Sequence, residues 1–248
     1  MAAITIAELV RNGTMSAEMA AVLWVAVDEK LSFLTVALPR MAGKSTTSEA
    51  ILALRPPGVP LNRVAGEAAL MERLKQERSG GYLVVQEFSQ APVPGYIWGP
   101  PVRRVFDTLS SGYSLQTCLH STGVEEGMLE VTEGNGVSDQ QASTFKLVLY
   151  IEMFGRIGVD VQRRLVEVYE VHRVENGRPL GQPLFLWRRD SDRFEKLSDP
   201  HQFGHDHDDL LHREQIIGGL AQTGHTSAEE VSRAIMDYRA AQGVKPPL

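Results

Sequence analysis

A glycine, a lysine and two hydroxyl residues stand in a row where they could bind a phosphate group. The tripeptide Gly43-Lys44-Ser45, followed by Thr46, comes after a largely apolar run and before a segment with helical spacing. Successive backbone N–H groups at a helix N-terminus attract an anion, a lysine reaches terminal phosphates, and a hydroxyl coordinates Mg²⁺. The sequence therefore predicts a phosphate-binding loop with the contact residues Met41, Ala42, Gly43, Lys44, Ser45 and Thr46.

The first half of this loop departs from the G-x-x-x-x-G-K-[ST] pattern. Leu38 stands where the pattern has its first glycine, and Pro39 has no backbone N–H. Glycine normally makes this turn because it adopts positive φ at little cost. A bare Gly-Lys-Ser tripeptide also arises by chance, but its place between a strand and a helix favours a true phosphate loop. Two outcomes remain, a loop that binds nucleotide and one that keeps only the scaffold.

Segments with strand and helix patterns alternate around this loop. Residues 31–38 are largely apolar and rich in β-forming types, which is typical of a strand buried on both faces of a parallel sheet. Further strands are predicted at 60–65, 82–88 and 114–119, and helices at 6–10, 16–29, 44–54, 66–77 and 102–110. Strand, helix and strand in this order predict a parallel sheet with right-handed crossovers.

The pattern changes from residue 159 onward. Apolar and polar residues alternate there and turn at Asn176-Gly177, which predicts an antiparallel hairpin or meander. Residues 210–242 return to helical spacing, with Thr226 and Ser227 opening the last helix. The sequence thus predicts an α/β fold with a mostly parallel central sheet, C-terminal antiparallel strands and terminal helices.

Composition excludes several classes of protein. The 248 residues are 43% hydrophobic and 23% charged, which suits a soluble globular chain with one large core or two small ones. The formal net charge of −6 gives no general attraction for nucleic acid, so no nucleic-acid partner is expected. Cys118 is the only cysteine, which excludes an intramolecular disulfide. Without a run of about 18 apolar residues or a signal-peptide pattern, a cytoplasmic protein is expected, peripheral at the inner membrane face if it serves a membrane machine.

Read as a whole, the first 52 residues resemble the stretch that leads into the nucleotide site of the type II/type IV secretion-system ATPases, especially the tight-adherence pilus branch. In that branch a helix pair with Leu-Val, Gly-Thr and Ser precedes a strand, a phosphate loop and a Thr-Thr helix start. The same order stands here in LVRNGTMS, SFLTVAL and GKSTT. The resemblance extends over nearly the whole chain, through YLVVQEF, SGYSLQTCLHST and VEVYEVHRVENGRPLGQPLFLW.

The resemblance implies a role for several side chains. Lys44 and Ser45 correspond to the phosphate-binding lysine and the Mg²⁺-coordinating hydroxyl. Glu87 matches the Walker B glutamate, which holds the water shell of the metal or orients the attacking water. His120 matches the family's histidine box, at a strand end where it could sense the γ-phosphate. The metal site is therefore expected at Ser45 and Glu87, although Gln86 replaces a family glycine.

Glu67 is the candidate for the family's acidic-box glutamate, which prepares the nucleophilic water. The expected catalytic set is then Glu87, Glu67 and His120. The local match RVAGEAAL is short, and a glutamate in the first turn of a helix also suits the helix dipole without any catalytic role. After Glu67 the chain offers a single helix where the family has further strands that carry arginines. Because phosphoryl transfer needs a full set of charge-stabilising groups, this departure predicts impaired hydrolysis.

The resemblance implies a single RecA-like P-loop NTPase domain over residues 1–248. Its parts are leading helices in 1–30, a nucleotide-binding core in 31–155, antiparallel strands in 156–200 and C-terminal helices in 205–248. The implied function is a nucleotide-binding subunit of a secretion or pilus-assembly motor, with ATP and Mg²⁺ as ligands. The implied partners are further copies of the chain, in a hexamer by family resemblance, and membrane-embedded platform proteins.

Two other functions remain in view. One is a non-catalytic scaffold or regulatory homologue that keeps the fold and has lost turnover. The other is a small-molecule P-loop kinase, which is less favoured because no arginine-rich lid segment follows the third strand.

Two further groups of residues are weaker candidates for sites. Four histidines interleaved with aspartates between 201 and 212 could chelate a divalent ion, but their spacing fits no zinc motif, and a solvated polar loop is favoured. Three pairs of adjacent arginines offer a candidate arginine finger, although such residues are more often solvated or ion-paired. These pairs are Arg103 and Arg104, Arg163 and Arg164, and Arg188 and Arg189.

Overall fold

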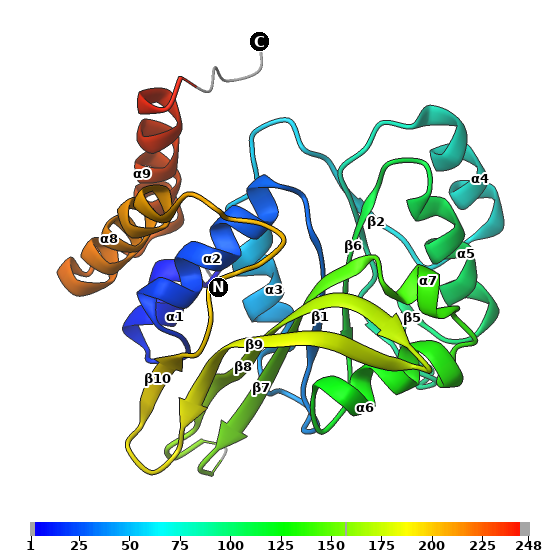
Figure 1. Ribbon diagram of the computed structural model, residues 1–248, viewed down its shortest axis with the longest axis horizontal. Helices are drawn as coiled ribbons and strands as arrows, with labels where there is room; N and C mark the ends of the chain where they lie inside the picture. The colour runs from blue at the N-terminus through cyan, green and yellow to red at the C-terminus, as the bar shows by residue number, and fades with distance from the viewer. Residues whose placement is uncertain (1–2, 157, 244–248) are drawn as a thin grey trace.

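One mixed β-sheet runs through the computed structural model, with helices on both of its faces (Figure 1). The structure describes residues 3–156 and 158–243; residues 1–2, 157 and 244–248 of the expected ranges lie outside it. In the described residues the strand order is β10-β9-β8-β7-β1-β6-β3-β2. No helix in this part of the chain is both long enough and apolar enough to cross a membrane.

The middle of the sheet is parallel. β7 (Phe145–Phe154), β1 (Ser32–Val36), β6 (Ser114–Leu119), β3 (Tyr82–Val84) and β2 (Leu61–Arg63) pair in that order. The short β4 (Glu87–Phe88) pairs with β5 (Tyr96–Ile97) and meets the end of β6. Every residue of β1 is buried, because helices cover the strand on both sides.

Beyond β7 the sheet becomes antiparallel. β8 (Gln162–Glu175) and β9 (Arg178–Arg188) form a long hairpin, and β10 (Arg193–Lys196) closes that edge. Asn176 and Gly177 both have positive φ, 52° and 74°, as a two-residue hairpin turn requires. The predicted Asn-Gly turn is therefore confirmed.

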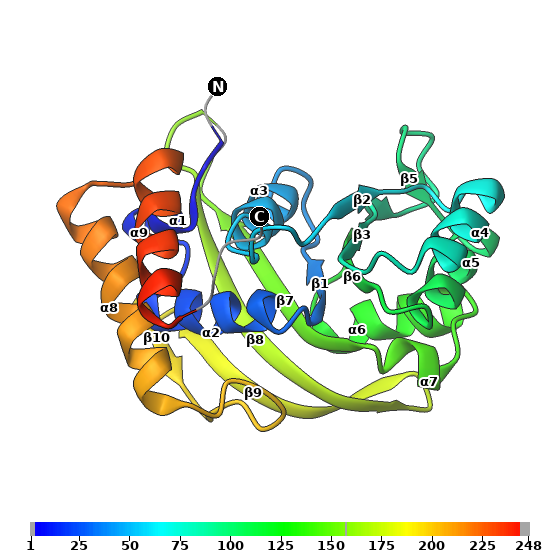
Figure 2. The same ribbon diagram turned by 90° about the horizontal axis from the view of Figure 1, so that it is seen from above.

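Helices from both ends of the chain cover one face of the sheet (Figure 2). They are α1 (Ile6–Arg11), α2 (Ala17–Asp28), α3 (Lys44–Leu52), α8 (His207–Thr223) and α9 (Ala228–Ala241). Trp24 lies fully buried at the centre of this core. Asp28 pairs with Arg213 of α8 and Arg239 of α9, and thereby anchors the C-terminal helices on α2.

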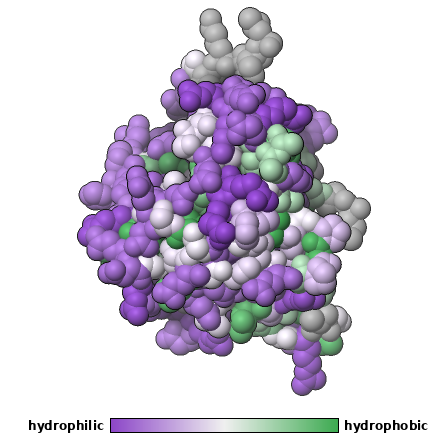
Figure 3. All heavy atoms as spheres, turned by 90° about the vertical axis from the view of Figure 1, so that its right-hand side faces the viewer, coloured by the Kyte–Doolittle hydropathy of each residue, from purple (hydrophilic) through white to green (hydrophobic). Residues whose placement is uncertain are grey.

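Helices from the middle of the chain cover the other face. They are α4 (Ala68–Glu77), α5 (Pro100–Leu109), α6 (Val124–Leu129), the π-helical turn η1 (Glu130–Gly134) and α7 (Asp139–Ala142). Their apolar residues form a second core against the sheet, and Phe33 and Leu34 of β1 face the first and the second core respectively. Figure 3 shows hydrophilic residues over most of the side that carries α4 and α5.

The predicted fold class is confirmed: parallel core strands, C-terminal antiparallel strands and C-terminal helices. One predicted strand is wrong in detail, because residues 82–88 form β3 and β4 with a break at Val85 and Gln86. The break lets β4 leave β3 and pair with β5. The short elements α6, η1 and α7 and the strand β7 were not predicted as separate elements.

A buried carboxylate fixes the connection between the sheet and the C-terminal helices. Glu170 of β8 is fully buried and accepts hydrogen bonds from the backbone N–H groups of His201 and Gln202 at 2.9 and 2.7 Å. The side chains of His172 and Gln182 also contact it, each at 3.1 Å. Burial alone would raise the pKa of Glu170, but these hydrogen bonds outweigh burial and hold it below its ordinary value of 4.5.

We expect Glu170→Gln to lower the free energy of unfolding at neutral pH by about 2 kcal/mol, because hydrogen bonds to a charged group are lost. The pKa of Glu170 is depressed in the folded state, so its contribution is present above pH 4.5 and fades as the pH falls through the folded value. Urea denaturation of both proteins from neutral to acidic pH should show the difference shrinking on acidification.

Glu167→Gln is the matched control on the same strand. Burial raises the pKa of Glu167, so removing its charge should not destabilise the protein at neutral pH. Equal losses in the two variants would contradict the assigned role of Glu170.

Candidate functional site

Neighbouring strands end at one edge of the sheet and bring three charged or polar side chains together. Lys44 begins α3 after the loop that follows β1, His120 directly follows β6, and Glu87 lies on β4. Since parallel strands end at the same edge, the order β1-β6-β3 places these residues side by side. The site thus depends on the sheet order, and its residues are far apart in the sequence.

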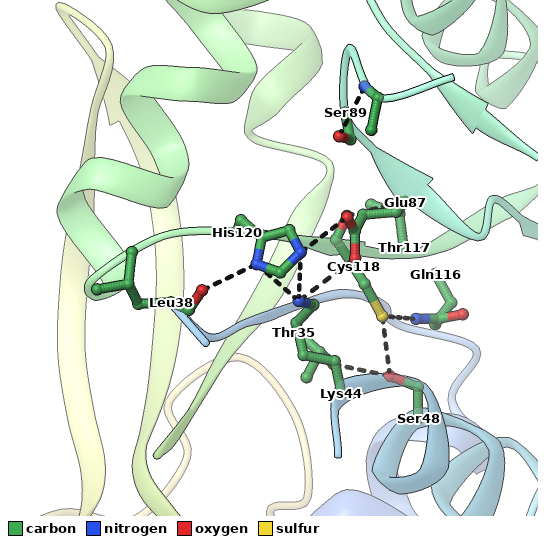
Figure 4. A network of polar contacts seen from close by, with 11 residues as sticks. Thr35, Leu38, Lys44, Ser48, Glu87, Ser89, Gln116, Thr117, Cys118 and His120 are labelled. Carbon is green, nitrogen blue, oxygen red and sulfur yellow. Dashed lines mark hydrogen bonds and ion pairs between the residues drawn. The ribbon is translucent and has the colours of Figure 1, made fainter. Parts of the chain in front are cut away.

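The three side chains are in direct contact (Figure 4). Lys44 Nζ lies 3.3 Å from Glu87 Oε2 and 3.3 Å from His120 Nδ1. His120 Nε2 lies 3.1 Å from Glu87 Oε1. Lys44 is only 6% exposed and Glu87 only 4%, so their ion pair is shielded from solvent. His120 is half-buried and stands at the opening.

His120 connects the loop to the ion pair. Its Nδ1 lies 3.0 Å from the backbone oxygen of Leu38, which can only accept. Its Nε2 lies 3.4 Å from the Lys44 ammonium and 3.1 Å from Glu87 Oε1. The ring is thus held between the loop and the Lys44–Glu87 pair.

Glu87 Oε1 is a buried acceptor that no group in the described residues satisfies. His120 Nε2 lies 3.1 Å away, but its direction does not make a hydrogen bond to this oxygen. A buried oxygen without a donor is costly unless water or a cation meets it.

The loop before α3 has the shape of an anion cradle. Gly43 is the N-cap residue of α3 with φ of 98°, and Met41 also has positive φ, 66°. In the described residues no backbone N–H from position 41 to 46 donates to a protein acceptor. These N–H groups lie at a helix N-terminus, where the helix dipole also favours negative charge.

A pocket of about 830 Å³ opens over the loop. Its floor contains the loop residues 40–47, its inner wall Glu87 and His120, and its opposite wall Arg163 of β8. Ile4, Leu9 and Asn12, in and around α1, line the remaining side. The pocket thus combines a polar end at the loop with an apolar side at α1.

The structure brings all but one of the predicted site residues together. Met41, Ala42, Gly43, Lys44, Ser45, Thr46, Glu87 and His120 all line this pocket. Glu67 does not line it. Glu67 is the N-cap residue of α4, and its Oε2 accepts from the backbone N–H of Ala65 at 3.0 Å. It lines a separate pocket of about 280 Å³ with Gln86 and Arg63.

Leu38 does not block the loop despite replacing a glycine. It is 58% exposed and is absent from the pocket lining, and its backbone oxygen accepts from His120. Cys118 lies buried beneath α3, 3.8 Å from Ser48 Oγ. Burial raises the pKa of its thiol to about 11, so Cys118 is neutral and unreactive at physiological pH.

Tyr96 and Arg163 are among the pocket residues that the sequence-based prediction of the site did not include. Tyr96 lies near Glu87, and burial and then the charge of Glu87 raise the pKa of its hydroxyl. Arg163 was named only as one of a pair of arginines. No local signal indicates either residue, because β5 and β8 reach the pocket only through the sheet pairing.

The other paired arginines have partners within the chain. Arg103 and Arg104 donate to the backbone oxygens of Asn135 and Gly66. Arg164, Arg188 and Arg189 pair with Asp192, Glu195 and Glu152. In the histidine-rich segment, as elsewhere in the described residues, no three His, Cys, Asp or Glu side chains are placed to hold a metal ion.

No protein-family model and no curated protein matches the chain. Several solved structures do. The VirB11 ATPase from the Brucella suis type IV secretion system in complex with sulphate matches with a TM-score of 0.44 and 13% identity, over 62% of this chain and 52% of that one. The ATPase DotB from Legionella pneumophila matches with a TM-score of 0.40 and 12% identity, over 56% of this chain and 45% of that one. The ATPase DotB from Yersinia pseudotuberculosis matches with a TM-score of 0.41 and 9% identity, over 91% of this chain and 57% of that one.

The chain is distantly similar in structure to type IV secretion ATPases. It spans about half the length of the solved structures it matches. The similarity is to proteins of the kind that the sequence resemblance names.

We expect Lys44→Met to lower the free energy of unfolding by about 3 kcal/mol, because it leaves the Glu87 carboxylate buried without its cation. The double variant Lys44→Met/Glu87→Gln should regain much of this loss. Urea denaturation at neutral pH measures both effects.

Arg63→Met is the control, because it breaks an ion pair with Glu49 whose side chains are largely exposed. It should change stability by less than about 0.5 kcal/mol. A Lys44→Met protein as stable as the parent would show that the buried pair is not formed.

Proposed function

We propose that this chain binds ATP and Mg²⁺ in the pocket where β1, β4 and β6 end, as the nucleotide-binding subunit of a secretion or pilus-assembly motor. The observation that carries the proposal is the convergence of Lys44, Glu87 and His120 over a loop with free backbone N–H groups. The assignment to a secretion or pilus motor rests on the sequence resemblance alone.

The donor set fits a nucleotide phosphate and a magnesium ion. The N–H groups of residues 41–46 and the Lys44 ammonium suit phosphate oxygens. The hydroxyl of the exposed Ser45 and the unsatisfied Glu87 Oε1 suit a hard cation or its water shell. Bound Mg²⁺ would supply positive charge to neutralise the phosphates.

The residues of this chain have distinct tasks in the proposed site. Lys44 exchanges its carboxylate partner for phosphate, which releases Glu87 Oε2 to accept from water. His120 holds the loop through the Leu38 oxygen and places Nε2 beside Glu87. Glu87 is thereby the group best placed to orient an attacking water.

A second candidate is the non-catalytic homologue, a scaffold or regulatory protein that has lost turnover. The position of Glu67 in a separate pocket favours it, because the expected acidic-box glutamate is then missing from the site. Nucleotide binding without rapid hydrolysis is consistent with the observed residues. The two candidates differ in phosphate release, not in ATP binding.

The same proposal includes the larger context that the sequence resemblance implies. The chain would form a single RecA-like P-loop NTPase domain and assemble as a homo-oligomer, a hexamer by family resemblance. It would work in the cytoplasm, at the inner membrane face, on membrane-embedded platform proteins.

We expect isothermal titration calorimetry to detect ATP binding that is strengthened by Mg²⁺. Ser45→Ala should weaken the binding of MgATP about tenfold or more, because a metal ligand is lost, while ATP without Mg²⁺ binds as in the parent. Ser45 is exposed, so this variant keeps its stability, which Lys44 variants do not.

Ser191→Ala, in the exposed turn between β9 and β10, is the matched control and should bind as the parent does. The proposed metal site would be contradicted if ATP bound equally well with and without Mg²⁺ and if Ser45→Ala left this binding unchanged. Phosphate release measured on the same samples separates a motor from its non-catalytic relative.

A further inference from the structure

Arg163 reaches the phosphate loop from β8, which β7 separates from β1 in the sheet. It stands at the beginning of β8, which pairs antiparallel with β7, and its side chain lies against the loop. Its Nε and Nη2 donate to the backbone oxygen of Met41 at 3.2 and 3.0 Å. These two residues are 122 positions apart, so the contact exists only in the folded chain.

This contact orients the peptide group between Met41 and Ala42. The carbonyl is held toward Arg163, and since C=O and N–H of a trans peptide point in opposite directions, the N–H of Ala42 points away from the arginine. At the other side of the loop, the backbone oxygen of Leu38 accepts a hydrogen bond from His120. The loop that lacks its first glycine is therefore held at two carbonyls by side chains from β8 and from the end of β6.

The stem of Arg163 also packs on the glycine of the loop. A Cβ added at Gly43 would lie 2.9 Å from Arg163 Cδ, so the arginine stem would have to shift. The φ of 98° at Gly43 independently favours glycine. Arg163 and Gly43 form one continuous surface at the end of the pocket.

Arg163 keeps donors for a ligand. A guanidinium has five N–H groups, and the Met41 oxygen occupies only the edge formed by Nε and Nη2. Among the described residues no carboxylate forms an ion pair with Arg163, whereas Lys44 is already engaged by Glu87. Arg163 is half-buried and lines the pocket, so its charge is directed at the space above the N–H groups.

We propose that Arg163 is a second cationic ligand of the nucleotide phosphates, supplied by the same chain, and that it also positions the loop that binds them. The proposal deepens the ATP-binding function and rests on it. The guanidinium group of Arg163 is planar and permanently charged, so it can make both contacts at once. One edge donates to the Met41 carbonyl, and the end of the group donates to phosphate oxygens. The chain then needs no glycine at position 38 to shape its loop.

The test is a calorimetric comparison of MgATP, MgADP and AMP on the parent, Arg163→Ala, Arg163→Lys and Arg193→Ala. Arg193 is an exposed arginine on β10 and controls for the loss of one charge. Arg163→Ala should weaken MgATP binding about ten- to a hundredfold and AMP binding much less, since the lost contact is to the terminal phosphates. Arg163→Lys should bind MgATP more tightly than Arg163→Ala and more weakly than the parent, because lysine keeps the positive charge but lacks the paired N–H donors of the guanidinium.

Hydrogen exchange of residues 38–43 without nucleotide gives the second readout. Exchange in this loop should rise in both Arg163→Ala and Arg163→Lys, because neither holds the Met41 carbonyl in a fork. Arg193→Ala should match the parent in exchange and in all three affinities.

Each alternative outcome has one meaning. MgATP affinity within twofold of the parent in Arg163→Ala would overturn the role of Arg163 while the proposed function stands. Equal weakening of MgATP, MgADP and AMP would reduce Arg163 to a support of the fold and also overturn the proposal. Absence of nucleotide binding in the parent, with a stable fold, would overturn both the proposed function and this inference.

Discussion

The buried ion pair between Lys44 and Glu87 is the constraint around which this end of the molecule is built. Both side chains are almost inaccessible, at 6% and 4% exposure. A buried charge that loses its partner is strongly destabilising, so the strands that carry them must keep their ends adjacent. The pair also holds a cation beside the loop. In the proposed function a phosphate would compete with Glu87 for Lys44, so nucleotide binding would weaken this ion pair.

The surrounding structure fixes both ends of the helix that carries Lys44. At its N-terminus, the loop is held by His120 at the Leu38 carbonyl and by Arg163 at the Met41 carbonyl. Beyond its C-terminus, Arg239 of α9 donates to the backbone oxygens of Leu54 and Arg55 while pairing with Asp28. The C-terminal helices therefore brace α3 directly, and its N-terminus is left free to meet an anion.

Local patterns carried most of the fold prediction. The strand before the loop, the helix after it and the Asn176-Gly177 turn were all predictable, because apolar spacing and turn chemistry are properties of short segments. The break between β3 and β4 was not, since pairing with β5 decides it. The four-residue α7 is too short to show a helical period in the sequence.

The same distinction separates the predictable from the unpredictable parts of the site. Lys44 was found through the Gly-Lys-Ser motif, and Glu87 and His120 through the family resemblance. The sheet order brings the three side chains to one edge. Glu67 was grouped with them on a short local match, but the path of the chain after β2 sends it to another pocket. Arg163 could not be singled out among the six paired arginines, because only the register of β8 on β7 brings it to the loop.

A crystal structure with a non-hydrolysable ATP analogue and Mg²⁺ tests the central claim most directly. The account predicts phosphate oxygens against the N–H groups of residues 41–46, with Lys44 Nζ moved from Glu87 Oε2 to the phosphates. Nucleotide bound elsewhere, or a loop that stays empty with the Lys44–Glu87 pair intact at saturating analogue, would contradict it.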